Sequence, residues 1–438
     1  MTDPFERERA FILNCSFKEE IPVPQLDFDW EFILKESIRH GVAPLIYETL
    51  RWEGKFFSPI HQGLEALYYA TASKNLHLLR VAGETVRSLK EGGVRALPLK
   101  GVSLVERRYG NIALRPFEDI DLLIQKRDFS RARRVLEELD YHPPDYLLPD
   151  RFYLDYHFHL PFIKEKPKQV YLELHWDFTD RYMLFTPDMD AVWSRASEVL
   201  HPEDELIYLA MHLEKHGYLN KLLFKKKEKE AVAFIFNPLS GNRLIWFVDL
   251  RLFLNHLKNQ LIWENITEIA RQWGARETLG SALFLLEALT GSRGLYGLPC
   301  KPKEKLTLTE TFLYRAAFRE RGSRSMAALL KMDSTTQFRP IRIFDFVHYL
   351  FPPGDYLRRC YHYRRPLAML FYRGYHLIRC STRDLLRPLT ILWIVLIKEL
   401  YRRGGRFLGK RGGITRRGQD ATKSEARISK STRPKDLT

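Results

Sequence analysis

The chain is poor in cysteine and in long apolar runs, and each shortage excludes a class of protein. Its four cysteines, Cys15, Cys300, Cys360 and Cys380, are far apart and form no C-x-x-C pair, so they predict neither a disulfide framework nor a cysteine-rich metal site. The longest apolar run covers only residues 389–397, whereas a membrane-spanning helix needs about 20 residues. The N-terminus lacks the apolar stretch of a secretory signal. We therefore expect a reduced, cytoplasmic protein.

Acidic residues are also in deficit, with 54 Asp and Glu against 70 Lys and Arg, which gives a formal net charge of +16. This excess predicts an anionic partner: a nucleotide, a nucleic acid or an acidic membrane surface. Residues 402–438 hold 12 of the basic residues and 3 of the acidic ones, together with paired glycines, and we expect this tail to be disordered. Together with the apolar run just before it, the tail favours peripheral attachment to the inner face of the membrane.

The 438 residues, 45% of them hydrophobic, can bury a large core in two or three folding units. Apolar residues recur at helical spacing before residue 92 and after residue 199, whereas strand-like alternation lies between these points. These patterns predict an α+β fold in five segments: an N-terminal helical lead-in (1–92), a domain with the strands (93–198), a helical bundle (199–300), a basic aromatic helical region (301–401) and the tail (402–438).

The stretch 97–124, LPLKGVSLVERRYGNIALRPFEDIDLLI, carries the densest chemical signal. If its last six residues form a strand, Asp119 and Asp121 project from one face, because side chains alternate along a strand. Two carboxylates so close repel each other unless a cation lies between them, and oxygen ligands suit Mg²⁺. The alternative is a strand end that exposes two solvated aspartates.

Lys100-Gly101, the expected helix after them, Arg115 and Asp119-x-Asp121 resemble the signature of nucleotidyltransferases with a DNA-polymerase-β-like fold. They are most similar to an uncharacterised bacterial branch in which L-K-G precedes R-x-x-x-D-I-D-L. The resemblance implies a small mixed sheet flanked by N-terminal helices and a large C-terminal helical region. It also implies transfer of a nucleoside monophosphate from a triphosphate such as ATP to a hydroxyl group, with release of pyrophosphate and two Mg²⁺ ions, which Mn²⁺ can replace.

In polymerase-β-like enzymes a third acid comes from a neighbouring strand. Residues 152–163 and 170–178 alternate in polarity and predict an antiparallel pair. Glu173 in the second segment is the third acid that the resemblance implies, as a metal ligand or general base beside Asp119 and Asp121. Asp177 lies on the same face of that strand and is the alternative.

Four residues are candidates for binding the nucleotide. Gly101 permits close approach of backbone N–H groups to a phosphate at a helix start. Many related enzymes have Ser directly after this Gly, whereas Ser103 follows one residue later, which weakens its expected phosphate contact. Lys100 and Arg115 are candidates for the β- and γ-phosphates, and a structural role for either is the alternative.

Three other features in the second half of the chain have competing interpretations. His212 and His216 share one face of a helix predicted over 201–217, but Leu213 stands where a zinc protease needs Glu, so we interpret the pair as packing or orienting residues. The lysines in 220–243 indicate a solvated loop or a site for a phosphorylated substrate, and AVAFIF within it suggests a short hairpin. Aromatic residues and arginines alternate from residue 356, which suits nucleic acid, an anionic membrane or a solvated helical hairpin.

Two functions therefore compete. The first is an active nucleotidyltransferase whose acceptor is a small molecule, a carbohydrate intermediate, a protein or an RNA end. The second is a catalytically lapsed protein that binds nucleic acid or an anionic membrane through residues 356–438. The complete set of Asp119, Asp121 and Glu173 favours the enzyme, and the decisive observation is whether these three carboxylates converge.

Overall fold

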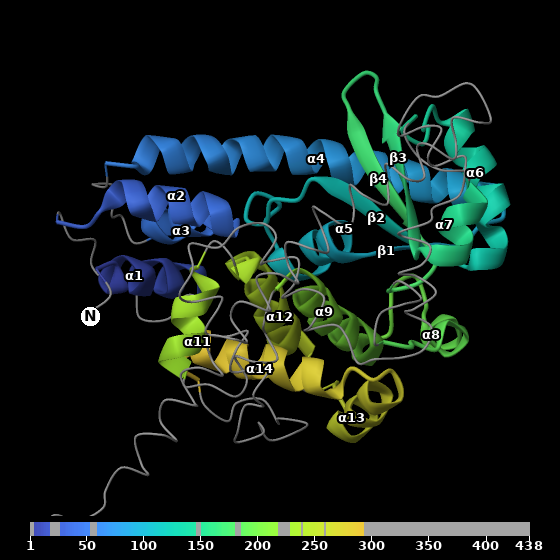
Figure 1. Ribbon diagram of the computed structural model, residues 1–438. Coiled ribbons are helices and arrows are strands. Elements are labelled where there is room, and N and C mark those ends of the chain that lie inside the picture. Colours follow the sequence, from blue (N-terminus) through green and yellow to red (C-terminus); the bar gives the residue numbers. More distant parts are fainter. Residues whose placement is uncertain are drawn as a thin grey trace, which may run out of the picture. The chain divides into compact units, whose positions relative to one another are not determined.

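The computed structural model describes residues 4–17, 27–52, 59–145, 150–179, 185–217, 228–237, 240–257 and 260–292, all within one compact unit (Figure 1). The expectations for the lysine-rich run 221–227, the aromatic region and the basic tail fall outside these residues. Within the described ranges, no helix combines the length and the apolar character that a membrane span requires. The predicted division into five segments stays a prediction.

Four short strands form a mixed sheet, as expected. The strands are β1 (Ala96–Pro98), β2 (Asp119–Ile124), β3 (His159–Lys164) and β4 (Val170–His175), in the order β1-β2-β4-β3. β2 runs antiparallel to β1 and parallel to β4, and β3 and β4 form an antiparallel pair. The α+β class and the strand pairing predicted from the alternating segments are therefore confirmed.

One face of the sheet is the hydrophobic core. Ile120, Leu122, Leu172 and Leu174 are fully buried, and they pack in one cluster with apolar residues of α4 (His61–Glu91) and α6 (Phe129–Glu138). Because side chains alternate along β2 and β4, the residues between these positions project to the other face. Burying each of these large side chains stabilises the fold by roughly 1.5–3 kcal/mol, so the core fixes which face of the sheet the acidic residues occupy.

Capping residues mark the ends of the N-terminal helices. Asp29 accepts a hydrogen bond from the backbone N–H of Phe32 and caps α2 (Trp30–His40). Gly41, at φ +71°, ends α2 in the left-handed conformation before α3 (Ala43–Trp52). Gly92 and Gly93 end α4.

Two strand predictions were wrong. Residues Asp150–Tyr156 form helix α7, not the start of a strand, and Tyr153 and Leu154 pack against the core from that helix. The AVAFIF segment lies largely in helix α11 (Glu228–Ile235), because its buried residues Ala231, Phe234 and Ile235 have the spacing of one helical face. In both segments short apolar runs fit helix and strand equally well, and packing decides.

The second half of the described chain is helical, as expected. Helices α8 (Met189–Arg195), α9 (Pro202–His216), α12 (Leu244–Leu257), α13 (Trp263–Gln272) and α14 (Arg276–Thr290) follow the sheet. Of these, α9, α12 and α14 pack on one another (Figure 1). α9 and the start of α12 supply one wall of the site described below.

A buried ion pair joins this helical region to the segment before β2. The guanidinium of Arg115 donates from Nε and Nη2 to the two carboxylate oxygens of Asp249 on α12, at 2.7 Å each, and the hydroxyl of Tyr109 donates to the same carboxylate at 2.6 Å. The Arg115 and Asp249 side chains are 7% and 3% exposed. Within the described residues each charge is therefore compensated mainly by its partner, and losing one partner would leave a poorly compensated buried charge.

We expect Asp249→Asn to destabilise the protein by about 3–5 kcal/mol, because it leaves the buried Arg115 without a counter-charge. Replacing both partners with apolar residues, Arg115→Met with Asp249→Leu, should cost much less. Urea unfolding of the two variants and the wild type measures both effects. A single variant that loses less than about 1 kcal/mol would show that this pair does not hold the two parts together.

Candidate active site

The three predicted acids meet on the face of the sheet opposite the core. Asp121 and Glu173 are register partners in the parallel β2–β4 ladder, and Asp119 lies two residues before Asp121 on the same face. One carboxylate oxygen from each of the three lies within 4.8 Å of the others. The structure thus brings together side chains that are 54 positions apart in the chain. Asp177 does not belong to this group, and its carboxylate accepts a hydrogen bond from the backbone N–H of Phe178.

Asp121 is the most tightly held of the three. It is 2% exposed, and its Oδ1 accepts hydrogen bonds from Nζ of Lys100 and from Nε2 of His175, both at 2.8 Å. Burial raises the pKa of Asp121, but Lys100 and His175 outweigh it and hold the pKa well below its ordinary value. Asp121 is therefore ionised at neutral pH. Both contacts use the same oxygen, and neither involves Oδ2.

Asp119 has the opposite character. Burial, followed by repulsion from Asp121, raises its pKa to about 6. The Lys100 ammonium opposes this shift but contacts Asp121, not Asp119. Two carboxylates on one strand face thus have pKa values displaced in opposite directions. This is the pattern expected where charge is crowded and a further cation would be accommodated.

His175 and His159 are site residues that the sequence analysis did not single out. Nε2 of His175 lies 2.8 Å from Asp121 Oδ1 and 3.2 Å from Glu173 Oε2, so this imidazole joins two of the acids. The hydrogen bond from His175 contributes to lowering the pKa of Glu173, although burial raises it. Nε2 of His159 lies 3.8 Å from Glu173, and burial, then His175, lowers the pKa of His159 to about 4. The one sequence signal was position: His175 follows Glu173 by two residues on the same strand face.

The His159, Glu173 and His175 side chains form a second convergent set, in which one ligand atom of each lies within 4.8 Å of the others. It shares Glu173 with the acidic set. Imidazole nitrogens suit transition metals better than Mg²⁺, whereas the three carboxylates suit Mg²⁺ or Mn²⁺. The acidic set is therefore the one whose donor chemistry matches the predicted metal.

Lys100 and Gly101 stand at the start of α5 (Lys100–Leu104), which continues as the π-helical turn η1 (Val105–Tyr109). Lys100 has φ +42°, a conformation that costs a residue with a side chain on the order of 1–3 kcal/mol. In this backbone conformation the ammonium of Lys100 contacts Asp121. Packing explains why position 101 is a glycine, because a Cβ there would lie 2.8 Å from the Phe117 ring.

Arg115 and Ser103 have protein partners. The Arg115 guanidinium is bound to Asp249, which is the structural alternative stated above, although the residue also lines the cleft described next. Ser103 is 3% exposed, and its side chain interacts with Glu205 on α9. It is not among the residues that line the cleft.

A cleft of about 850 Å³ opens in front of the three acids. Its first wall comes from the sheet and the segment before β2, and its second from α9 and the start of α12. The second wall carries basic and aromatic side chains, none of which the sequence analysis assigned to the site: His212, Lys215, His216, Arg243 and Trp246. His212 and His216 both pack against the Trp246 ring, with ring centroids 5.2 Å apart. Their predicted packing role is confirmed.

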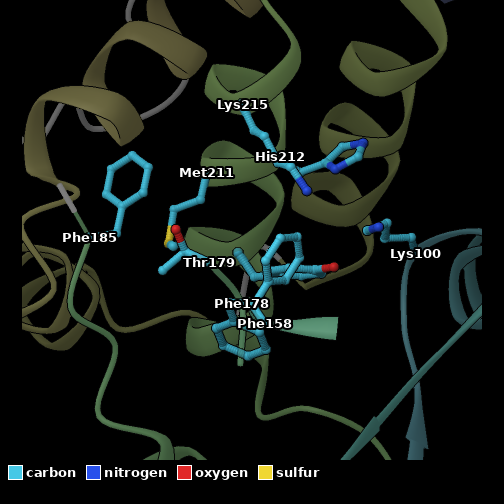
Figure 2. Close-up of a pocket in the computed structure, with 9 residues that line it drawn as sticks. Lys100, Phe158, Phe178, Thr179, Phe185, Met211, His212 and Lys215 are labelled. Atoms are coloured by element: carbon cyan, nitrogen blue, oxygen red, sulfur yellow. The ribbon is translucent and has the colours of Figure 1, made fainter. Parts of the chain in front are cut away.

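A smaller hollow of about 310 Å³ adjoins the cleft and shares Lys100, His212 and Lys215 with it. Figure 2 shows Lys100 at one end of this hollow and Phe185 at the other, with Phe158, Phe178 and Met211 between them. Its lining is thus largely aromatic away from the acids.

Comparison with known proteins agrees with the geometry of the site. A family model described as an uncharacterised nucleotidyltransferase matches residues 27–291. That range contains the sheet, the three acids and both walls of the cleft. No curated protein and no solved structure matches the chain.

The raised pKa of Asp119 gives a pH dependence with a definite sign. Between its ordinary value of 3.8 and the folded value of about 6, the folded state keeps a proton that the unfolded state has lost. Stability from this group is therefore present below pH 3.8 and is lost as the pH rises through 6. Without divalent cations, we expect wild type to lose on the order of 3 kcal/mol relative to Asp119→Asn between pH 4 and pH 7.

Urea unfolding of both proteins at four pH values in EDTA measures this difference, and the titrating groups that do not interact with Asp119 cancel between them. A difference that stays constant across the range would show that Asp119 is not perturbed in this way.

Proposed function

The chain belongs to the uncharacterised nucleotidyltransferase family, and on this premise we propose that it transfers a nucleoside monophosphate from a nucleoside triphosphate to a hydroxyl-bearing acceptor, with release of pyrophosphate. The observation that carries the proposal is the convergence of Asp119, Asp121 and Glu173, from two parallel strands, on the floor of a cleft. The polymerase-β-like type of the sheet is part of the same proposal.

The donor set fits Mg²⁺ or Mn²⁺, because it consists of three carboxylates with oxygens within 4.8 Å of one another. Asp119, Asp121 and Glu173 would hold two such ions. When bound, divalent ions neutralise the triphosphate and lower the pKa of the attacking hydroxyl. The raised pKa of Asp119 supports the fit, since this carboxyl is the one that most needs a further positive charge to ionise.

The protein's own groups then have separate tasks. Lys100 and His175 keep Asp121 ionised and fix its orientation through two hydrogen bonds to Oδ1. Glu173, held ionised beside His175, is placed to accept the proton of the incoming hydroxyl or to serve as a ligand. Lys100 and Gly101 line the cleft next to the acids and are the contacts we propose for phosphate oxygens.

The acceptor is a small molecule, a carbohydrate intermediate, a protein or an RNA end. The retained set of three acids disfavours a protein that only binds, because binding alone needs no convergent carboxylates. The sparse, scattered cysteines favour the cytoplasm as the compartment. The basic residues 356–438 would supply peripheral contact with an anionic membrane or a nucleic acid.

Asp119→Asn is the cleanest test of catalysis. It removes a metal ligand without taking a hydrogen-bond acceptor from Lys100 or His175, so we expect an intact fold and a loss of nucleotide transfer of at least about 10²–10³-fold. Asp121→Asn should abolish transfer too, but with a loss of stability. Asp177→Asn, which removes a carboxylate just past the C-terminal end of β4 and outside the cluster, is the matched control and should keep wild-type activity.

The assay incubates each protein with labelled nucleoside triphosphates, Mg²⁺ and cell extract, and follows which acceptor becomes labelled. Thermal melting with and without Mg²⁺-ATP reports binding alongside it. Full transfer activity in Asp119→Asn would contradict the proposed role of the acids.

A further inference from the structure

We propose that Arg243, at the start of α12, binds the outer phosphates of the nucleotide. The inference rests on the proposed function and assigns the triphosphate end of the substrate to a residue that neither the family match nor the sequence motifs indicate. Arg243 lines the same cleft as Asp119, Asp121 and Glu173 and belongs to the wall formed by the helical region.

The first reason is that Arg243 is a half-buried cation without a counter-charge. Among the described residues, none forms an ion pair with its guanidinium or accepts a hydrogen bond from it, and its Nε is buried without a partner. Two acids influence its pKa, and both have other partners: Glu118 forms an ion pair with Lys74, and Asp249 forms one with Arg115. The other arginine of the cleft lining, Arg115, is bound to Asp249. An uncompensated charge of this kind is costly, and an anionic ligand would supply the missing partner.

The second reason is that Arg243 is held in place. A Cβ at Gly41 would lie 2.7 Å from its Nη2, so the guanidinium packs directly over that glycine. Its Cζ lies 5.9 Å from the centroid of the Trp246 ring. The backbone beside it is fixed as well, because the N–H of Leu244 donates to Nδ1 of the buried His40 at 3.2 Å. A fixed guanidinium binds an anion at a smaller entropic cost than a mobile surface side chain.

The third reason is the division of charge across the cleft. The acidic wall suits divalent ions and the reacting α-phosphate, but the same carboxylates repel the β- and γ-phosphates. Those groups need cationic partners away from the acids, and a planar guanidinium matches phosphate oxygens in a two-point geometry. Arg243 thus binds the β- and γ-phosphates, a role for which the sequence analysis had named Arg115 as a candidate. The proposal assigns phosphate as the ligand of Arg243, and other residues of the cleft would bind the nucleoside.

The test compares binding of triphosphates and monophosphates. Calorimetry in Mg²⁺ without acceptor measures ATP, GTP, CTP and UTP, each beside its monophosphate, for wild type and Arg243→Gln. We expect the variant to bind the preferred triphosphate about 10–100-fold more weakly and its monophosphate unchanged, as for loss of a charged hydrogen-bonded contact. The matched control is Arg80→Gln, whose side chain is 65% exposed on α4, and it should change neither.

Thermal melting of the ligand-free proteins gives a second readout. Because Arg243 has no counter-charge, Arg243→Gln should melt at or above the wild-type temperature. A marked fall in melting temperature would mean that Arg243 is structural and would overturn the inference, unless Arg243→Lys restores stability while still binding the triphosphate more weakly than wild type. Equal losses for triphosphate and monophosphate, or no loss for either, would overturn it while leaving the proposed function intact. A wild type that binds none of the four triphosphates would instead refute the proposed function.

Discussion

The parallel pairing of β2 with β4 is the constraint on which the site depends. It places Asp121 beside Glu173 in register, and the alternation of side chains then puts Asp119 on the same face. A shift of one residue would turn Glu173 into the core and bring an apolar neighbour to the cleft. The buried residues on the other face, Leu172 and Leu174 among them, oppose such a shift because each would be forced out of the core. Hydrophobic packing on one side of the sheet thus specifies the arrangement of charges on the other.

The arrangement of charges is asymmetric in a way that fits the proposed chemistry. Asp121 is satisfied within the protein by Lys100 and His175, whereas Asp119 is left with a raised pKa of about 6. On the facing wall, Arg243 is a cation without a counter-charge among the described residues. One side of the cleft is therefore short of positive charge and the other short of negative charge. A metal-bound triphosphate has both charges, separated along its length.

The sequence could predict what depends on local periodicity. The alternation around Asp119 and Glu173 placed these acids on strand faces, and the resemblance to a family supplied the expectation that the strands are neighbours. It could not predict partners that are brought together by tertiary packing. Asp249 lies 134 positions after Arg115, and nothing in its surroundings marks it as the residue that binds that guanidinium. Arg243 was missed for a related reason: it is significant because it lacks a partner, and a sequence does not show which charges remain unpaired. Residues 152–156 were misassigned to a strand because a short amphipathic run fits either period.

The contact between Gly101 and Phe117 has a consequence for how such sequences are compared. Because any side chain at position 101 would meet the ring of Phe117, two residues before Asp119, the glycine of the L-K-G segment is needed for α5 to pack against the entry to β2. A descendant that had lost its carboxylates but kept this architecture would still require it. The glycine therefore indicates a shared architecture, whereas the proposed activity depends on the three acids.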